Sequence, residues 1–128
     1  MAKRTPPTRA EARAAVERVA GWLDDDTVAP ERGAIADAVR ASARYLAALH
    51  PGGALELRVP PYVAVQCVEG LNHRRGTPPN VVELDPRTWL ALATGRRAWE
   101  DVVTAGVSAS GSRADLTALV PIRGLVDE

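Results

Sequence analysis

A chain of 128 residues is long enough for one hydrophobic core and leaves little room for a second domain. Its 16 basic and 16 acidic side chains cancel, which excludes the strongly basic character of a nucleic-acid-binding protein and an acidic solvating tail. No apolar run approaches the roughly 20 residues of a transmembrane segment. Cys67 is the only cysteine, so an intramolecular disulfide is excluded and a reducing, cytoplasmic location is expected.

The first part of the chain carries the pattern of two helices. Thr8 and Glu11 form a capping box, in which each side chain satisfies a free backbone amide of the other residue, and apolar residues then recur at helical spacing up to Leu23. Pro30 suits the first position of a second helix, because its fixed φ and missing amide proton cost nothing there. The sequence therefore predicts an antiparallel or crossed helix pair over residues 8–50.

The remainder of the chain changes to a mixed strand and helix pattern over residues 54–120. Leu55, Leu57 and Val59 alternate with polar residues, which predicts a strand with one solvent-exposed face. The next elements are expected to be a central strand over 62–69, a surface loop over 70–80, a strand over 81–84, a helix from Asp85 and Pro86 to Gly95, a short helix over 99–104, an edge strand over 107–111, and a helical turn that begins with a capping box at Ser112 and Asp115.

Two segments resemble a known family. In the segment from Val81 to Leu119, an apolar strand leads to the motif Asp-Pro-Arg-Thr-Trp-Leu-Ala-Leu-Ala-Thr-Gly-Arg, and a short helix around Trp99 follows. The motif Val-Ser-Ala-Ser-Gly and a final helix complete the order. This segment resembles the carboxyl half of sterol-carrier-protein domains. Residues 58–70 and 73–83 resemble a narrower branch, the sterol carrier family proteins of actinobacteria. Together the resemblance covers roughly the last three quarters of the chain.

The resemblance implies an α/β (α+β) fold, with a mixed sheet of about four to five strands backed by helices. It also implies an apolar cavity between the sheet and the helices that accepts acyl chains or other lipids, without a cofactor. We expect a disordered segment over residues 1–7 and a single sterol-carrier-like domain over 8–128, in which the helix pair precedes the sheet.

Two groups of side chains are candidate ligand-binding residues. In the loop, His73, Arg74 and Arg75 could converge on a carboxylate or phosphate head group at the mouth of a cavity. Alternatively, this loop only positions the next strand, and its arginines pair with Glu69 or Glu83. The second group consists of apolar side chains that either line a cavity or fill the core: Tyr62, Val63, Val65, Cys67, Trp89, Leu90, Trp99 and Val102.

The sequence offers little for catalysis. A cysteine inside an apolar strand has a raised pKa, and no third group that would orient His73 toward Cys67 is identifiable. No histidine or cysteine spacing is typical of a metal site. We therefore expect a non-enzymatic protein that binds a small apolar or acyl ligand.

Two other functions stay open. One is an interaction or regulatory module that keeps the fold without a usable cavity and binds a protein partner or a second copy of itself. The other is an accessory domain of an enzyme, because thiol-dependent isomerases of actinobacteria carry a similar domain beside a metal-binding helical bundle. This sequence contains no such bundle, which disfavours the accessory role.

Overall fold

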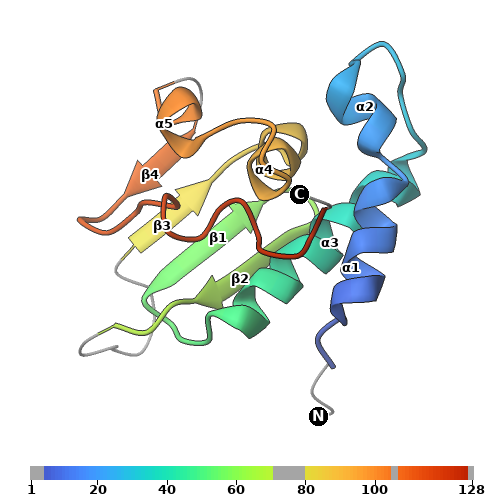
Figure 1. The fold of residues 1–128 in the computed structure, drawn as a ribbon. Coiled ribbons are helices and arrows are strands. Elements are labelled where there is room, and N and C mark those ends of the chain that lie inside the picture. Colours follow the sequence, from blue (N-terminus) through green and yellow to red (C-terminus); the bar gives the residue numbers. More distant parts are fainter. Residues whose placement is uncertain (1–4, 71–79, 105–106, 127–128) are drawn as a thin grey trace.

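The fold combines five helices with one small sheet in the part of the chain that the computed structural model describes, residues 5–70, 80–104 and 107–126 (Figure 1). The predicted mixed α+β class is confirmed. In chain order the elements are α1 (Arg9–Glu17), α2 (Ala20–Asp24), α3 (Arg32–Leu49), β1 (Leu55–Val59), β2 (Val63–Cys67), β3 (Asn80–Glu83), α4 (Pro86–Ala93), α5 (Trp99–Val102) and β4 (Ser108–Ser110).

The described sheet has four strands in the order β2-β1-β3-β4. β1 pairs with β3 in parallel, whereas β2 and β4 pair antiparallel with their neighbours. The segment that contains β2 was predicted to be a central strand, and this is wrong. Because β1 pairs directly with β3, β2 has a neighbour on one side only. Its β-branched residues reflect the burial of one face, since Val63 and Val65 are half-buried while Ala64 and Gln66 are exposed.

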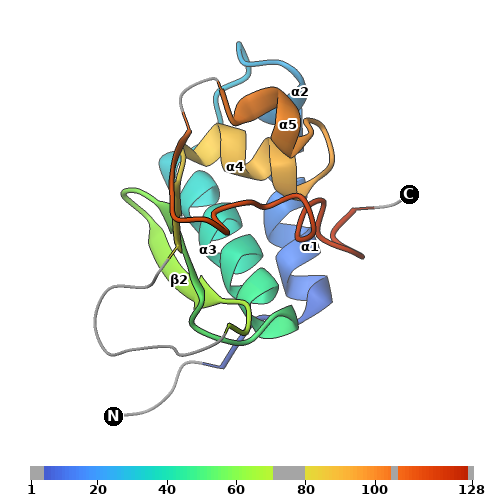
Figure 2. The ribbon, with the colours of Figure 1, turned by 90° about the vertical axis from the view of Figure 1, so that its left-hand side faces the viewer.

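Helices cover one face of this sheet. Leu57 and Val59 of β1 and Val82 of β3 are completely buried on that inner face. Figure 2 shows α3 lying between the sheet and α1, and both β2 and α4 contact α3. The opposite, outer face carries polar residues, among them Glu56 and Arg58, whose side chains form an ion pair of 2.6 Å. The core thus lies between the inner face, α3 and α4.

Local signals at the helix starts are mostly confirmed. The capping box of Thr8 and Glu11 is present, with hydrogen bonds of 2.8 and 3.1 Å. The expected single first helix is wrong, however, because the chain makes a tight turn at Arg18 and Val19 that separates α1 from α2. Pro30 lies one residue before the actual cap of α3, which is Glu31.

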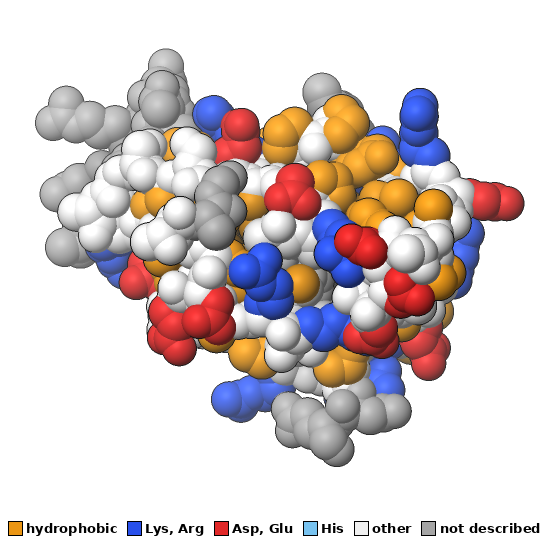
Figure 3. Space-filling model, turned by 90° about the horizontal axis from the view of Figure 1, so that it is seen from above, with side chains coloured by type: hydrophobic (Ala, Val, Ile, Leu, Met, Phe, Trp, Pro, Cys, Tyr) orange, Lys and Arg blue, Asp and Glu red, His pale blue; other side chains and the backbone are white. Residues whose placement is uncertain are grey.

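Charged side chains tie α2 to α4. Arg96 Nε donates to Asp24 Oδ1 at 2.7 Å, and Arg96 Nη2 donates to Asp24 Oδ2 at 3.1 Å. The Arg87 guanidinium donates to the backbone oxygens of Trp22 and Leu23 and lies 5.9 Å from the Trp22 ring centroid. The face above α2 and α4 consequently shows basic and acidic side chains side by side (Figure 3).

The C-terminal segment, residues 111–126, crosses in front of the sheet toward α1 (Figure 1). The predicted capping box is absent, because Asp115 accepts a hydrogen bond from the backbone amide of Thr117 instead. The predicted turn is present as a single hydrogen-bonded turn, in which the amides of Leu119 and Val120 donate to the Leu116 carbonyl. Leu116, Ile122 and Leu125 are nevertheless buried, and the Ile122 amide donates to the Ala93 carbonyl at 2.9 Å. This segment is therefore held in place by apolar anchors and forms a single turn over 116–120.

Candidate functional site

A pocket of about 410 Å³ lies between the amino ends of β1 and β3 and the C-terminal segment. We call it the C-terminal pocket. The register places Leu55 and Asn80 opposite each other on the inner face, and both are buried. Its described lining residues are Ala54, Leu55, Val68, Asn80, Ser112, Arg113, Asp115, Thr117, Ala118 and Leu119.

Asn80 joins the two walls of the C-terminal pocket. Its side-chain Nδ2 donates to the Ala54 carbonyl at 2.9 Å, and its Oδ1 accepts from the Arg113 amide at 2.8 Å. Only 5% of Asn80 is exposed. A buried carboxamide is stable here because both of its polar atoms have partners, and these two bonds fix where the C-terminal segment begins to cross the sheet.

Val68, on a second wall of the pocket, has an unusual backbone conformation. Its φ of 68° lies in the left-handed region, which β-branched residues rarely adopt. Backbone hydrogen bonds from Val68 to His50 and from Ala54 to Val68 hold this conformation. A Cβ at Gly52 would lie 2.2 Å from the Val68 oxygen, so the close approach requires glycine.

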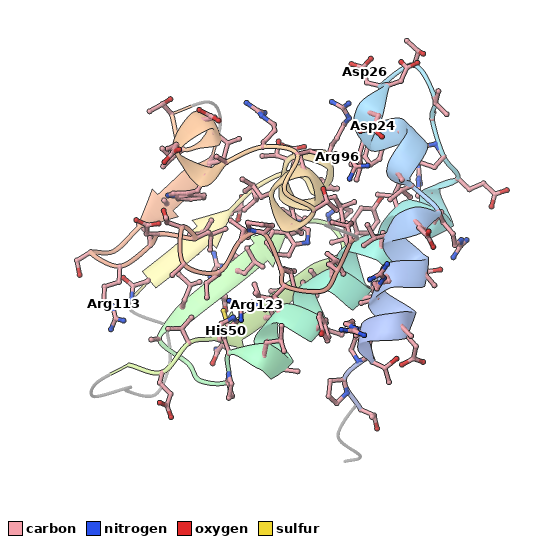
Figure 4. All side chains as sticks on the ribbon, in the orientation of Figure 1. Asp24, Asp26, His50, Arg96, Arg113 and Arg123 are labelled. Atoms are coloured by element: carbon pink, nitrogen blue, oxygen red, sulfur yellow. The ribbon has the colours of Figure 1, made fainter. Side chains whose placement is uncertain are left out.

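One basic and one acidic side chain stand at the rim of the C-terminal pocket. The Arg113 guanidinium, labelled in Figure 4, is exposed and makes no hydrogen bond or ion pair with the described residues. It lies near Gly70, where an added Cβ would be 3.9 Å from Arg113 Nη1. Hydrogen bonds from the Thr117 side chain and backbone lower the pKa of Asp115, so this carboxylate is ionised at neutral pH.

A comparison with protein families decides the identity of the fold. A family model described as "Bacterial SCP ortholog" matches residues 31–122. The chain belongs to this bacterial sterol-carrier-protein family. The matched residues include α3, the sheet and the lining of the C-terminal pocket, whereas α1 and α2 precede them. No curated protein matches the chain.

The apolar candidates on the helices lie inside the core of this sterol-carrier-type domain. Trp89, Leu90 and Val102 are completely buried, and Trp99 is 7% exposed. The Trp89 indole Nε1 donates to the Ser42 hydroxyl oxygen at 2.9 Å. None of these four side chains lines the C-terminal pocket, and a role for them in lining a cavity stays a prediction.

None of the candidates around β2 is among the residues that line the C-terminal pocket. Tyr62 is half-buried and packs against the Arg40 guanidinium, whereas Val63 and Val65 pack their half-buried side chains against the core. Cys67 is buried beside Leu55 in the sheet, and this burial raises the pKa of its thiol to about 11. A thiol with this pKa is neutral at physiological pH and therefore a poor nucleophile.

The loop candidates His73, Arg74 and Arg75 lie outside the described residues. The two described residues that flank the loop, Gly70 and Asn80, are both at the C-terminal pocket.

Sequence reasoning missed Asn80 and Arg113. The sequence did contain a signal for Asn80. Side chains of a strand alternate between the two faces of the sheet, so the alternation that buries Val82 and Leu84 on the inner face also places Asn80 there. A polar residue at such a position needs partners, which the start of the next segment provides.

The described residues lack two further kinds of feature. They contain no group of three or more His, Cys, Asp or Glu side chains that could hold a metal ion. They also contain no helix long and apolar enough to cross a membrane.

Proposed function

We propose that this chain is a non-catalytic carrier that binds a small apolar or acyl ligand in the C-terminal pocket. The observation that carries the proposal is the pocket itself. Its volume of about 410 Å³ falls in the usual range for ligand sites, roughly 300 to 1,000 Å³. Membership in a sterol-carrier-type family supports the apolar class of ligand.

The lining supports one polar and one apolar end for this ligand. Leu55, Val68 and Leu119 supply apolar contacts, and the Arg113 guanidinium at the rim offers donors for a carboxylate. The described lining contains no histidine and no cysteine, so it offers neither a base that titrates near pH 7 nor a thiolate. Binding without chemical conversion is the function that these side chains support.

Volume limits the length of the ligand. A ten-carbon fatty acid has twelve heavy atoms and needs about 360 Å³ at roughly 30 Å³ for each, the share of a water molecule in the liquid. Decanoate is therefore a suitable probe. Calorimetric titration of the purified protein with decanoate should give saturable binding at one site.

A matched pair of variants locates the binding. Ala118 is exposed and lines the C-terminal pocket, so Ala118→Trp fills the pocket without changing the core. Ala48 is exposed on α3 and does not line this pocket, so Ala48→Trp controls for an added indole. We expect A118W to abolish decanoate binding and A48W to preserve it. Equal binding by both folded variants would refute this site.

A second candidate function is association with another copy of the chain through β2. This edge strand contains no charged residue and no proline, the features that usually protect sheet edges. Sedimentation equilibrium tests the idea with Gln66→Lys, which adds a charge on the exposed face of the strand. Concentration-dependent dimers that Q66K abolishes would support self-association, and a monomer at every concentration would exclude it.

A further inference from the structure

A second pocket, with a volume of about 1060 Å³, lies apart from the C-terminal pocket, between α1 and α3. We call it the arginine groove. Residues 5–7 and α1 form one side, α3 forms the other, and Tyr62 from the turn between β1 and β2 contributes one end. Figure 2 shows the two helices side by side. Since the family match begins at residue 31, one whole side of this groove lies outside the matched residues.

Arg40 is held in one orientation in the arginine groove. Its Nε donates to the Tyr62 carbonyl at 3.2 Å, and its guanidinium carbon lies 6.0 Å from the centroid of the Tyr62 ring. The side chain is half-buried, and its two Nη groups have no partner among the described residues. A fixed guanidinium with two parallel donors fits the oxygens of a phosphate or carboxylate.

A second arginine reinforces this site. Arg44 follows Arg40 by one helical turn and also lines the groove, and side chains at this spacing are neighbours on a helix surface. An anion that lies between the two guanidinium groups would be attracted by both. The floor beside them is formed by Ala14, Ala15 and Ala41, whose small side chains leave room for a ligand.

The acidic side chains of the groove already have partners. Asp37 Oδ2 lies 3.2 Å from Arg18 Nη1 across the groove, and Glu11 Oε1 accepts a hydrogen bond from the Thr8 amide. The ion pair compensates the charge of Asp37, whereas the backbone amide orients the Glu11 carboxylate and leaves its charge in place. The described lining has three arginines and two acids, so its net charge is positive.

We propose that the arginine groove binds an organic phosphate, with the phosphate oxygens held by Arg40 and Arg44. The site is separate from the C-terminal pocket and does not depend on ligand binding there. The phosphate could belong to a soluble small molecule or to the head group of a phospholipid, because both present the same oxygens to the arginines.

The test follows the guanidinium groups of the whole chain by nitrogen-15 NMR during titration with glycerol phosphate. We expect saturable shifts of the Arg40 Nε resonance and weaker binding by at least about tenfold in Arg40→Ala. Arg40→Lys should bind equally poorly, because an ammonium cannot make two parallel bonds. Arg44→Ala, which leaves the contact between Arg40 and Tyr62 in place, should also weaken binding.

Arg97→Ala is the matched control, because Arg97 is exposed, lines a different pocket, and its side chain makes no hydrogen bond or ion pair with the described residues. A second arm measures sedimentation with vesicles of phosphatidylcholine containing phosphatidic acid. Binding in the first arm identifies a soluble phosphate, and binding to vesicles alone identifies a head group. No binding in either arm, or an equal loss in R97A and folded R44A, would overturn the proposal.

Discussion

The Trp89 indole nitrogen and the Ser42 hydroxyl oxygen are 2.9 Å apart, and neither residue is exposed to solvent. Ser42 in turn donates its proton to the Ala38 carbonyl at 2.7 Å. The hydroxyl therefore accepts from α4 and donates within α3, so a single serine satisfies the only polar side-chain atom of Trp89, the largest of the fully buried side chains.

Replacing this serine should destabilise the fold. Ser42→Ala leaves the Trp89 indole N–H buried without an acceptor, which costs about 1 to 3 kcal/mol. Urea denaturation should show this loss, and Ser110→Ala on the exposed edge strand β4 should show little change. In the double variant with Trp89→Phe the effects should not add, because the phenylalanine has no donor to leave unsatisfied. Strict additivity would contradict a coupling through this bond.

Low pH should weaken the ion pair between Asp24 of α2 and Arg96, which follows α4. The hydrogen bond from Arg96 lowers the pKa of Asp24 from its ordinary value of 3.8 (Figure 4). A carboxyl group with a depressed folded pKa adds stability above its unfolded pKa, and this contribution is lost as pH falls through the folded pKa. The urea midpoint of the wild type should therefore fall more steeply below about pH 4 than that of Asp24→Asn.

The control for this pH effect is Asp26→Asn. Asp26 is close in sequence to Asp24, but it has no hydrogen bond or ion pair within the described part of the chain. D26N should keep the wild-type acid dependence. Asp25 and Asp115 also have lowered pKa values, because Thr27 and Thr117 donate to them, so D24N should retain part of the dependence. Identical pH curves for the wild type and D24N would argue against the Arg96 contact.

Cys67 should be inert in the folded protein. Burial raises the pKa of its thiol to about 11, so almost none is ionised at neutral pH, and the side chain is inaccessible. A disulfide reagent at about pH 7.5 should label the thiol only at the rate at which the fold opens. Adding urea should accelerate labelling steeply. Rapid labelling without denaturant would reopen the question of a nucleophilic role.

Replacing two different glycines by alanine should change the stability of the fold in opposite directions. An added Cβ at Gly52 would lie 2.2 Å from the Val68 backbone oxygen, and the φ of Gly52 is 147°. Gly52→Ala should therefore cost more than about 1 kcal/mol. At Gly33, in the first turn of α3, nothing lies within 4 Å of an added Cβ, and Gly33→Ala should stabilise the helix by up to about 1 kcal/mol. Thermal denaturation of both variants gives the two signs directly.

Elements with local causes could be predicted from the sequence. Thr8 and Glu11 begin α1, and Asp85 with Pro86 begins α4, because the bonds that start these helices join residues only three apart. The alternation of Leu57 with its polar neighbours likewise fixes which face of β1 is buried. The family resemblance supplied the fold class, which periodicity alone would have left open.

Elements with distant causes could not be predicted in this way. β2 is an edge strand because β1 and β3 pair across the intervening segment, and no local pattern encodes that choice. The predicted capping box at Ser112 and Asp115 is also absent because of a distant contact, in which the Arg113 amide donates to Asn80 Oδ1. From the sequence, the candidate site could be predicted only as an apolar cavity whose position in the fold was not specified. The size of a side chain such as Trp89 does not reveal whether it fills the core or lines a ligand cavity.

The C-terminal segment contributes Arg113 and Leu119 to the pocket after every helix and strand of the fold has already been specified. This wall is therefore irregular backbone, held to the sheet by the Asn80 hydrogen bond and by buried apolar side chains. Removing residues 112–126 would leave the pocket open on this side and would take the buried Leu116, Ile122 and Leu125 out of the core.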